Sequence, residues 1–239
     1  MKKLAIFAEG GTECCFVEKL LRSVTTAKDI RIEHVKMKGG GRHAPRHSTR
    51  IEIDAESDTQ KYYILIVDCR NDERVQSDIR DQYSALCKRG YNAIIGIRDV
   101  YPKSAAELPE LTLYLYYKIP TKPISPVIVL AVMEVEAWFL AEHTHFLRIN
   151  ETLTLEVVRQ TLAFDPSSEE VEQRPHPSDD LNLVYQVAGE KYVKEPAIIQ
   201  RTVDALDCDR LYLELPPKIE SLGILVKAVD DFFTTATIC

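Results

Sequence analysis

Acidic side chains follow four apolar runs whose composition is typical of buried strands. They are Glu9 after residues 4–8, Asp68 after residues 62–67, Asp99 after residues 93–97, and Glu134 with Glu136 after residues 127–132. Because ligands of open parallel α/β sheets bind at the carboxyl ends of the strands, we expect these carboxylates to lie close together. Oxygen ligands of this kind suit Mg²⁺ or Mn²⁺ better than zinc.

Two further carboxylates lie four residues beyond the first two strand ends. Glu13 follows Glu9, and Asp72 follows Asp68, at this spacing. Carboxylates that converge repel each other and are costly to remove from water unless a cation neutralises them. An acidic residue directly after a strand is also a common N-cap or first-turn residue of the next helix, where the helix dipole favours it. Four acidic strand ends together favour a metal site over four separate helix caps.

Basic side chains gather in two segments. In the first, the glycines at 39–41 are followed by three arginines. Its candidate nucleic-acid-binding residues are Lys38, Arg42, Arg46 and Arg50. Such a segment could wrap a phosphate backbone, and a solvated loop is the alternative interpretation. In the second, Lys191 and Lys194 flank Tyr192, and Lys194 is a candidate for stabilising a phosphate or a leaving group.

Other chemistries lack their motifs. The sequence has no GxxxxGKS/T segment, its Gly10-Gly11 pair falls short of the GxGxxG dinucleotide motif, and no serine lies in a GxSxG elbow. The 6 cysteines form no CxxC pair, so we expect free thiols.

The order of the expected elements predicts the fold class. Strands at 4–8, 30–37, 62–67, 93–97 and 127–132 alternate with helices, the first of which has Thr12 as its expected N-cap. Residues 111–117 could form an edge strand or a helix, and residues 39–50 are expected to form a loop. After residue 146 the periodicity is helical throughout. The sequence therefore predicts an α/β domain over residues 1–145, with a mainly parallel sheet and helices on both faces, and a helical C-terminal portion over residues 146–239 packed on it.

Charge and hydropathy exclude some classes of protein. The 239 residues include 30 Lys and Arg against 37 Asp and Glu, a net charge of −7, which argues against a protein that coats nucleic acid. No apolar stretch approaches the ~20 residues that cross a bilayer. The apolar part of the N-terminus is too short for a secretory signal, so we expect a cytoplasmic protein.

Five segments of the sequence resemble one protein family. Residues 5–13, a strand ending in E-G-x-T-E, resemble the first motif of Toprim domains, especially those of OLD-family and RloB-like nucleases. Residues 64–68 and 94–99 resemble the Toprim strands that end in metal-binding aspartates. Residues 133–141, Met-Glu-Val-Glu-Ala-Trp-Phe-Leu-Ala, are similar to the E-x-E-A-W/L-L segment of uncharacterised bacterial relatives, and residues 176–181 with Tyr192 and Lys194 are similar to their C-terminal helical region.

The resemblance implies a Toprim-like, Rossmann-like fold and a role for particular carboxylates. Glu9 would be the general acid/base or first metal ligand, Glu13 a ligand of a second metal, and Asp68 or Asp99 a further ligand. Toprim domains usually offer Asp-x-Asp at the later strand, whereas this chain has Asp-Cys-Arg at 68–70 and Asp-Val-Tyr at 99–101. Either Asp72 or the pair at 134 and 136 would then complete the site.

These observations support three functions. The leading hypothesis is a Mg²⁺- or Mn²⁺-dependent phosphodiester hydrolase acting on DNA or RNA. Glu9 and Lys194 would be its catalytic residues. The resemblance also implies a role in phage defence. The alternative is a non-catalytic Toprim-like subunit that partners an ABC-type ATPase, which the missing Asp-x-Asp and the acidic balance favour. A phosphotransferase or phosphatase acting on small molecules would use the same carboxylates.

Overall fold

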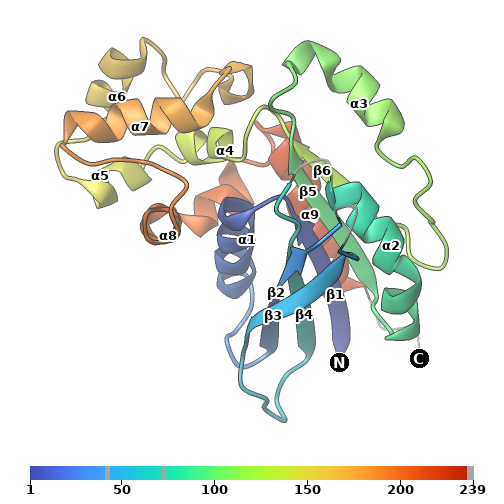
Figure 1. The fold of residues 1–239 in the computed structure, drawn as a ribbon. Helices are drawn as coiled ribbons and strands as arrows, with labels where there is room; N and C mark the ends of the chain where they lie inside the picture. The colour runs from blue at the N-terminus through green and yellow to red at the C-terminus, as the bar shows by residue number, and fades with distance from the viewer. Residues whose placement is uncertain (41–43, 72–73, 236–239) are drawn as a thin grey trace. The chain divides into compact units, whose positions relative to one another are not determined.

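A computed structural model describes residues 1–40, 44–71 and 74–235 of the chain (Figure 1). Within these residues six strands form one sheet in the order β3-β2-β4-β1-β5-β6. The strands are β1 (Lys2–Ala8), β2 (Ile30–Lys38), β3 (His47–Ile53), β4 (Tyr62–Asp68), β5 (Ala93–Asp99) and β6 (Val127–Ala131). β1 pairs in parallel with β4 and β5, β2 pairs in parallel with β4, and β3 is antiparallel to β2. The expected α/β class with a mainly parallel sheet is confirmed.

Helices connect the strands and make up most of the chain beyond β6. They are α1 (Gly11–Ser23), α2 (Arg74–Lys88), α3 (Leu108–Tyr114), α4 (Glu136–Ala141), α5 (His145–Ile149), α6 (Leu155–Leu162), α7 (Pro177–Val187), α8 (Pro196–Ala205) and α9 (Glu220–Thr234), with single turns η1 (Ala105–Glu107), η2 (Val171–Gln173) and η3 (Arg210–Glu214). The ambiguous segment 111–117 is helical in its first half, and the described residues after 146 contain no strand, as expected. Of the helices in the described ranges, none has the length and apolarity needed to span a bilayer.

The chain divides into two compact units that are each assembled from separate stretches of sequence. One comprises Met1–Arg98, Leu111–Val129 and Lys227–Cys239, and the other comprises Asp99–Glu110 and Leu130–Val226. The first contains most of the sheet with α1 and α2, and the second contains α4 to α8. The division at residues 145 and 146 stays a prediction.

Buried apolar side chains stabilise the sheet and pack the helices against it. Every residue of β1 from Leu4 to Ala8 is buried, as the unbroken apolar run requires for a central parallel strand. The crossover through α1 runs from β1 to β2, and that through α2 runs from β4 to β5 in the opposite direction, so the two helices lie on opposite faces. Gly96 lets α2 approach β5 closely, because a Cβ there would lie 2.8 Å from Ile79 Cδ1 and 3.1 Å from Val75 Cγ1.

The turn between β1 and α1 differs from the expected one. The N-cap of α1 is Gly10 rather than Thr12. The backbone N–H of Gly10 donates to Glu13 Oε2 at 2.9 Å, so the Glu13 carboxylate closes the first turn of the helix. Glycine can occupy this N-cap position because the capping hydrogen bond runs from its backbone N–H to the Glu13 side chain. No side chain is needed at residue 10 itself.

The glycine-rich segment is only partly the expected loop. Gly39 and Gly40 have positive φ angles of 76° and 94°, which glycine adopts without strain. From His47 onward the chain returns as β3 and pairs with β2, with a register shift between His34 and Val35. The expected loop over 39–50 is therefore wrong in its last four residues. Strand β3 forms because its backbone pairs with the outer edge of β2. Its side chains are mostly exposed, so the sequence gives no strong apolar signal for this strand.

A carboxylate of α1 that contacts β2 makes stability depend on pH. His34 Nε2 lies 2.9 Å from Glu18 Oε2, and Arg22 Nε donates to Glu18 Oε1 at 2.8 Å. The hydrogen bond to His34, with Arg22 adding to it, lowers the pKa of Glu18 from 4.5 to about 2. A lowered native pKa stabilises the fold above the unfolded value, and this contribution is lost as the pH falls from 4.5 to about 2.

We therefore expect Glu18→Gln to lower the free energy of unfolding by about 1 kcal/mol at pH 7, a value reduced by the partial solvent exposure of the pair. The difference from the parent should shrink as the pH falls below 4.5. Urea denaturation at pH 7 and pH 3.5 measures both values. Glu56→Gln is the control, because Glu56 meets Arg31 at 3.3 Å with its side chain 80% exposed and should change stability little at either pH. An equal loss for Glu18→Gln at both values of pH would contradict the prediction.

Candidate metal centre

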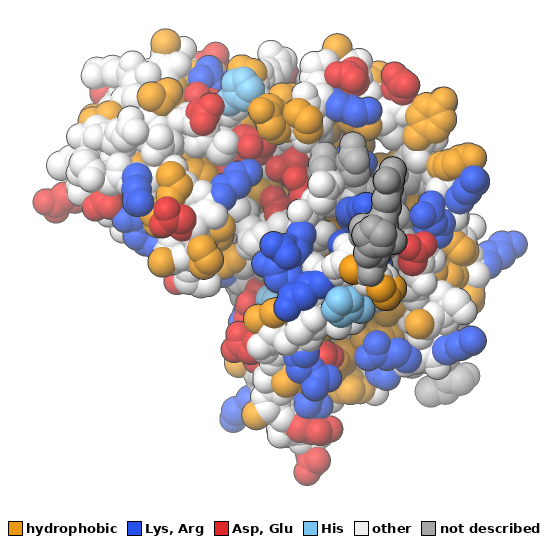
Figure 2. Space-filling view, viewed as in Figure 1, with side chains coloured by type: hydrophobic (Ala, Val, Ile, Leu, Met, Phe, Trp, Pro, Cys, Tyr) orange, Lys and Arg blue, Asp and Glu red, His pale blue; other side chains and the backbone are white. Residues whose placement is uncertain are grey.

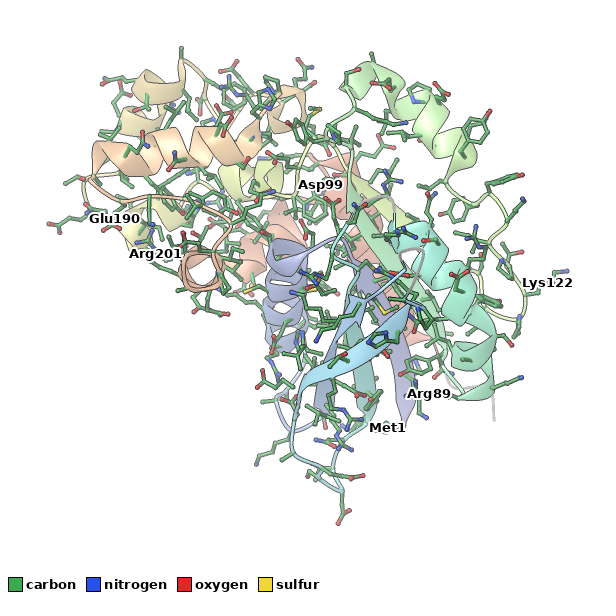
Figure 3. The ribbon with its side chains drawn as sticks, viewed as in Figure 1. Met1, Arg89, Asp99, Lys122, Glu190 and Arg201 are labelled. Carbon is green, nitrogen blue, oxygen red and sulfur yellow. The ribbon has the colours of Figure 1, made fainter. Side chains whose placement is uncertain are left out.

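Three buried carboxylates cluster in the unit that contains α4 to α8. Asp99, Glu134 and Glu136 each offer a ligand oxygen, and these oxygens lie within 4.8 Å of one another. Asp99 is the last residue of β5, Glu134 lies in the bend between β6 and α4, and Glu136 is the first residue of α4. Figure 3 labels Asp99 at the end of its strand. Three of the carboxylates that the sequence places after strands therefore do converge.

Backbone hydrogen bonds bring the two segments together. Beyond β5, Val100 N donates to Ala131 O at 3.0 Å and Tyr101 N donates to Met133 O at 2.9 Å. Met133 has a φ of 60°, in the left-handed region, and the chain turns there towards α4. Val135 N then donates to Asp99 Oδ1 at 3.0 Å. This last bond holds the Asp99 carboxylate against the residue that separates the two glutamates.

The start of α7 holds the Glu134 carboxylate. Ser178 N donates to Glu134 Oε2 at 2.9 Å and Ser178 Oγ donates to Glu134 Oε1 at 3.0 Å. Ser178 is the second residue of this helix, so its N–H has no acceptor within the helix, and the carboxylate satisfies it. The helix N-terminus, with its partial positive charge, therefore lies against the Glu134 carboxylate. The two hydrogen bonds from Ser178 fix the position of this carboxylate.

Glu136 is buried with one oxygen unsatisfied. Its side chain is 0% exposed. Tyr192 donates its hydroxyl to Glu136 Oε1 at 2.6 Å, whereas Glu136 Oε2 has no hydrogen-bond partner among the described residues. Burial raises the pKa of Glu136, and Glu134 adds to this effect while Lys194 and Tyr192 oppose it. A buried carboxylate oxygen without a partner is costly, and a bound cation would satisfy it.

Lys194 supplies the positive charge next to the cluster. Its Nζ lies 3.3 Å from Glu134 Oε1 and 3.4 Å from Glu136 Oε1. The side chain is 47% exposed, so its ammonium group can move away without entering the core. Lys194 thus contacts two of the three carboxylates of the cluster, and its expected catalytic role stays a prediction.

The donor set fits a hard divalent cation. It consists only of carboxylate oxygens, and one buried oxygen has no hydrogen-bond partner among the described residues. Mg²⁺ and Mn²⁺ prefer such ligands, whereas zinc sites more often include His or Cys. The residues that could hold a cation are thus Asp99, Glu134 and Glu136.

The other predicted metal ligands lie in the unit that contains α1 and α2. The Glu13 carboxylate caps α1, and Asp68 accepts from Arg70 N at 2.8 Å and pairs with Lys36 Nζ at 2.8 Å. Glu9 directly follows Ala8, which is the register partner of Asp68. Within residues 1–40, 44–71 and 74–235, no metal-binding group of three includes them. Asp72 lies outside the described residues, and the metal-binding and catalytic roles of this set stay predictions.

Two of the four predicted nucleic-acid-binding residues pair with carboxylates of the chain. Arg46 Nε donates to Asp78 Oδ1 at 2.8 Å, and Arg46 Nη2 donates to Cys69 O at 2.8 Å. Arg50 Nε donates to Glu33 Oε1 at 2.6 Å. Lys38 is exposed at the end of β2, and Arg42 lies outside the described residues.

Figure 2 shows Lys and Arg side chains gathered over the region of β2 and β3. Because Asp78 is buried, Arg46 has a structural partner that a phosphate would have to displace. Nucleic-acid binding by this set stays a prediction.

The sequence interpretation missed two groups that shape the cluster. Ser178, which binds Glu134, follows a His-Pro pair typical of a helix start, and that signal could have marked a free backbone N–H. In the sequence, Tyr192 stands between two lysines and belongs to the segment similar to the Toprim relatives, and neither feature points to Glu136. Its bond to Glu136 spans 56 residues of sequence, a separation at which local patterns carry no information.

The fold and the cluster define an α/β protein with a buried acidic site. No protein-family model, curated protein or solved structure matches the chain. The resemblance to Toprim domains thus remains an expectation from the five sequence segments.

Proposed function

We propose that this protein is a Mg²⁺- or Mn²⁺-dependent phosphodiester hydrolase acting on DNA or RNA, with its metal centre at Asp99, Glu134 and Glu136. The observation that supports it most is the buried cluster of three carboxylates with an unsatisfied Glu136 oxygen and an ammonium group beside it. Hydrolysis of a phosphodiester needs positive charge where the phosphoryl oxygens become more negative. A cytoplasmic nuclease with a role in phage defence is consistent with the sequence resemblance.

Each residue of the cluster has a distinct task in this proposal. When bound, a divalent cation supplies Lewis-acid polarisation of a phosphoryl oxygen. Ser178 and Val135 keep Glu134 and Asp99 in place through their backbone N–H groups. Lys194 can turn from the glutamates towards the phosphate or the leaving oxygen, because its side chain is partly exposed.

Calorimetric titration with Mg²⁺ and Mn²⁺ tests the centre. We expect binding by the parent and loss of binding by the double variant Asp99→Asn, Glu134→Gln. Glu9→Gln is the matched control, because Glu9 also follows a strand but lies outside the cluster of three. Incubation of each protein with plasmid DNA and with total RNA then reports cleavage.

The outcomes separate two positions for the centre. Loss of both cation binding and cleavage in the double variant, with neither lost in Glu9→Gln, supports the proposal. Loss in Glu9→Gln alone would place the centre at the ends of β1 and β4 and contradict the assignment. A parent protein that binds neither cation would contradict a metal-dependent hydrolase altogether.

A second candidate function is supported by one exposed segment. Helix α3 has no buried residue, and Leu113, Tyr114 and Tyr117 expose their side chains. Exposed apolar groups in a row favour a protein contact. This observation supports the alternative of a subunit that partners an ABC-type ATPase. Co-purification with such an ATPase, lost on Leu113→Ser with Tyr117→Ser, would support it.

A further inference from the structure

An aromatic side chain follows the Asp99 carboxylate. Tyr101 lies two residues beyond Asp99, and its backbone N–H donates to Met133 O at 2.9 Å, directly before Glu134. These backbone bonds place Tyr101 at the same strand end as the carboxylate cluster. Its side chain is 42% exposed, unlike the buried acids beside it.

A second ring packs against the first from the start of α7. His176 lies two residues before Ser178, whose N–H and hydroxyl both bind Glu134. The rings of Tyr101 and His176 meet edge to face, with centroids 5.6 Å apart and an interplanar angle of 76°. His176 is also exposed, so both rings are accessible while each restricts the other's rotamers. Tyr101 belongs to the segment that follows Asp99, and His176 belongs to the segment whose serine binds Glu134. Both rings are therefore connected to the carboxylate cluster.

Two lysines provide positive charge, one close to Tyr101 in sequence and one in contact with the carboxylate cluster. Lys103 is exposed, and its backbone N–H donates to Val100 O at 3.0 Å in the turn that carries Tyr101. Lys194 contacts Glu134 and Glu136. Exposed aromatic rings in the same segments as cationic side chains and the carboxylate cluster match the chemistry of a nucleotide, which presents a planar base and a phosphate separated by one sugar.

We infer that Tyr101 and His176 form a subsite that stacks an unpaired nucleobase beside the scissile phosphate. The inference rests on the proposed function and specifies its substrate class as single-stranded nucleic acid or unpaired ends. In a duplex each base is paired and stacked between its neighbours, so its face is not available to the two rings. Base stacking on aromatic side chains tolerates any sequence, so the subsite selects strandedness.

Binding of fluorescent oligonucleotides, followed by anisotropy with Ca²⁺ in place of Mg²⁺, tests the subsite without turnover. We expect Tyr101→Ala and His176→Ala each to weaken binding of a single-stranded pentamer by about 5- to 100-fold. Tyr101→Phe keeps the ring and should stay within about twofold of the parent. Circular dichroism should show an unchanged fold, because both side chains are exposed.

A pentamer with abasic residues provides the matched substrate control. The parent should bind the abasic pentamer as weakly as Tyr101→Ala binds the normal pentamer. The Tyr101→Ala substitution should not weaken binding of the abasic pentamer any further. Equal binding of normal and abasic pentamers by the parent would overturn the inference. Equal binding of the normal pentamer by the parent and both alanine variants would overturn it too, and would point to a protein as the ligand of these rings.

The two proposals can fail separately. If the parent binds the cation and cleaves duplex, single-stranded and abasic substrates alike, and Tyr101→Ala does the same, the proposed function stands and the subsite is wrong. If the parent binds no cation and cleaves nothing, yet its affinity for the pentamer falls on Tyr101→Ala, the subsite stands and the hydrolase proposal is wrong.

Discussion

Replacing Glu136 by glutamine should abolish metal binding and at the same time stabilise the apoprotein. We expect the affinity for Mg²⁺ or Mn²⁺ to fall by roughly 100-fold or more, because a charged ligand becomes neutral. We also expect the free energy of unfolding without metal to rise by about 1 kcal/mol or more, since the cost of a buried charge is removed. Calorimetric titration measures the first effect and urea denaturation in EDTA the second.

The hydrogen-bond pattern of Glu136 explains why the substitution is tolerated. Its Oε1 accepts from Tyr192, and the amide oxygen of glutamine can do the same. Its Oε2 has no partner among the described residues, so the new NH₂ group displaces no donor and lies near the remaining carboxylates. A residue kept for folding would not be improved by such a change. A gain in stability with loss of binding is therefore typical of a functional site.

Glu142 provides the matched control, because it is also 0% exposed. Burial raises the pKa of both carboxyls, so desolvation alone does not distinguish them. Both oxygens of Glu142 are used: Oε1 accepts from Thr144 N at 3.2 Å and Oε2 accepts from Asp207 N at 3.1 Å. Either orientation of a glutamine would bring its NH₂ group against a backbone N–H.

Glu142→Gln should thus destabilise the protein by about 1–3 kcal/mol and leave the metal affinity unchanged. Destabilisation of the apoprotein by Glu136→Gln to the same extent would mean that Glu136 serves the fold. The metal-centre proposal would then lose its main support.

Lys194→Met should raise the affinity for the divalent cation while lowering phosphodiester cleavage. The ammonium group lies 3.3 Å from Glu134 and 3.4 Å from Glu136, where it repels an incoming cation and competes for the same oxygens. We expect about tenfold tighter binding, a modest gain because the exposed side chain can already move aside. Cleavage should fall by about 100-fold, since the charge near the phosphate is lost.

Lys191→Met is the control for this second prediction. Lys191 lies in the same segment, but it pairs with exposed Glu195 at 3.8 Å and does not contact the cluster. Metal affinity and cleavage should both stay near the parent values. Weaker metal binding by Lys194→Met would show that the lysine organises the carboxylates, and it would exclude competition between the ammonium group and the cation.

Much of the fold followed from local patterns in the sequence. Unbroken apolar runs such as residues 4–8 predict buried parallel strands because both faces of such strands are covered, and this strand is buried throughout. Helical periodicity beyond residue 146 was equally informative. Strand β3 was missed, because an exposed edge strand needs only backbone pairing with its neighbour and its side chains carry little signal.

The sequence by itself determined which residues could bind a metal, and the tertiary structure decided which of them meet. Carboxylates after strands are a local property, visible in one dimension. Their grouping depends on strand order and on the turn at Met133, which bring the end of β5 against the segment after β6. The contacts of Glu134 with Ser178 and of Glu136 with Tyr192 join residues 44 and 56 positions apart, and only the packing of the helices sets such contacts.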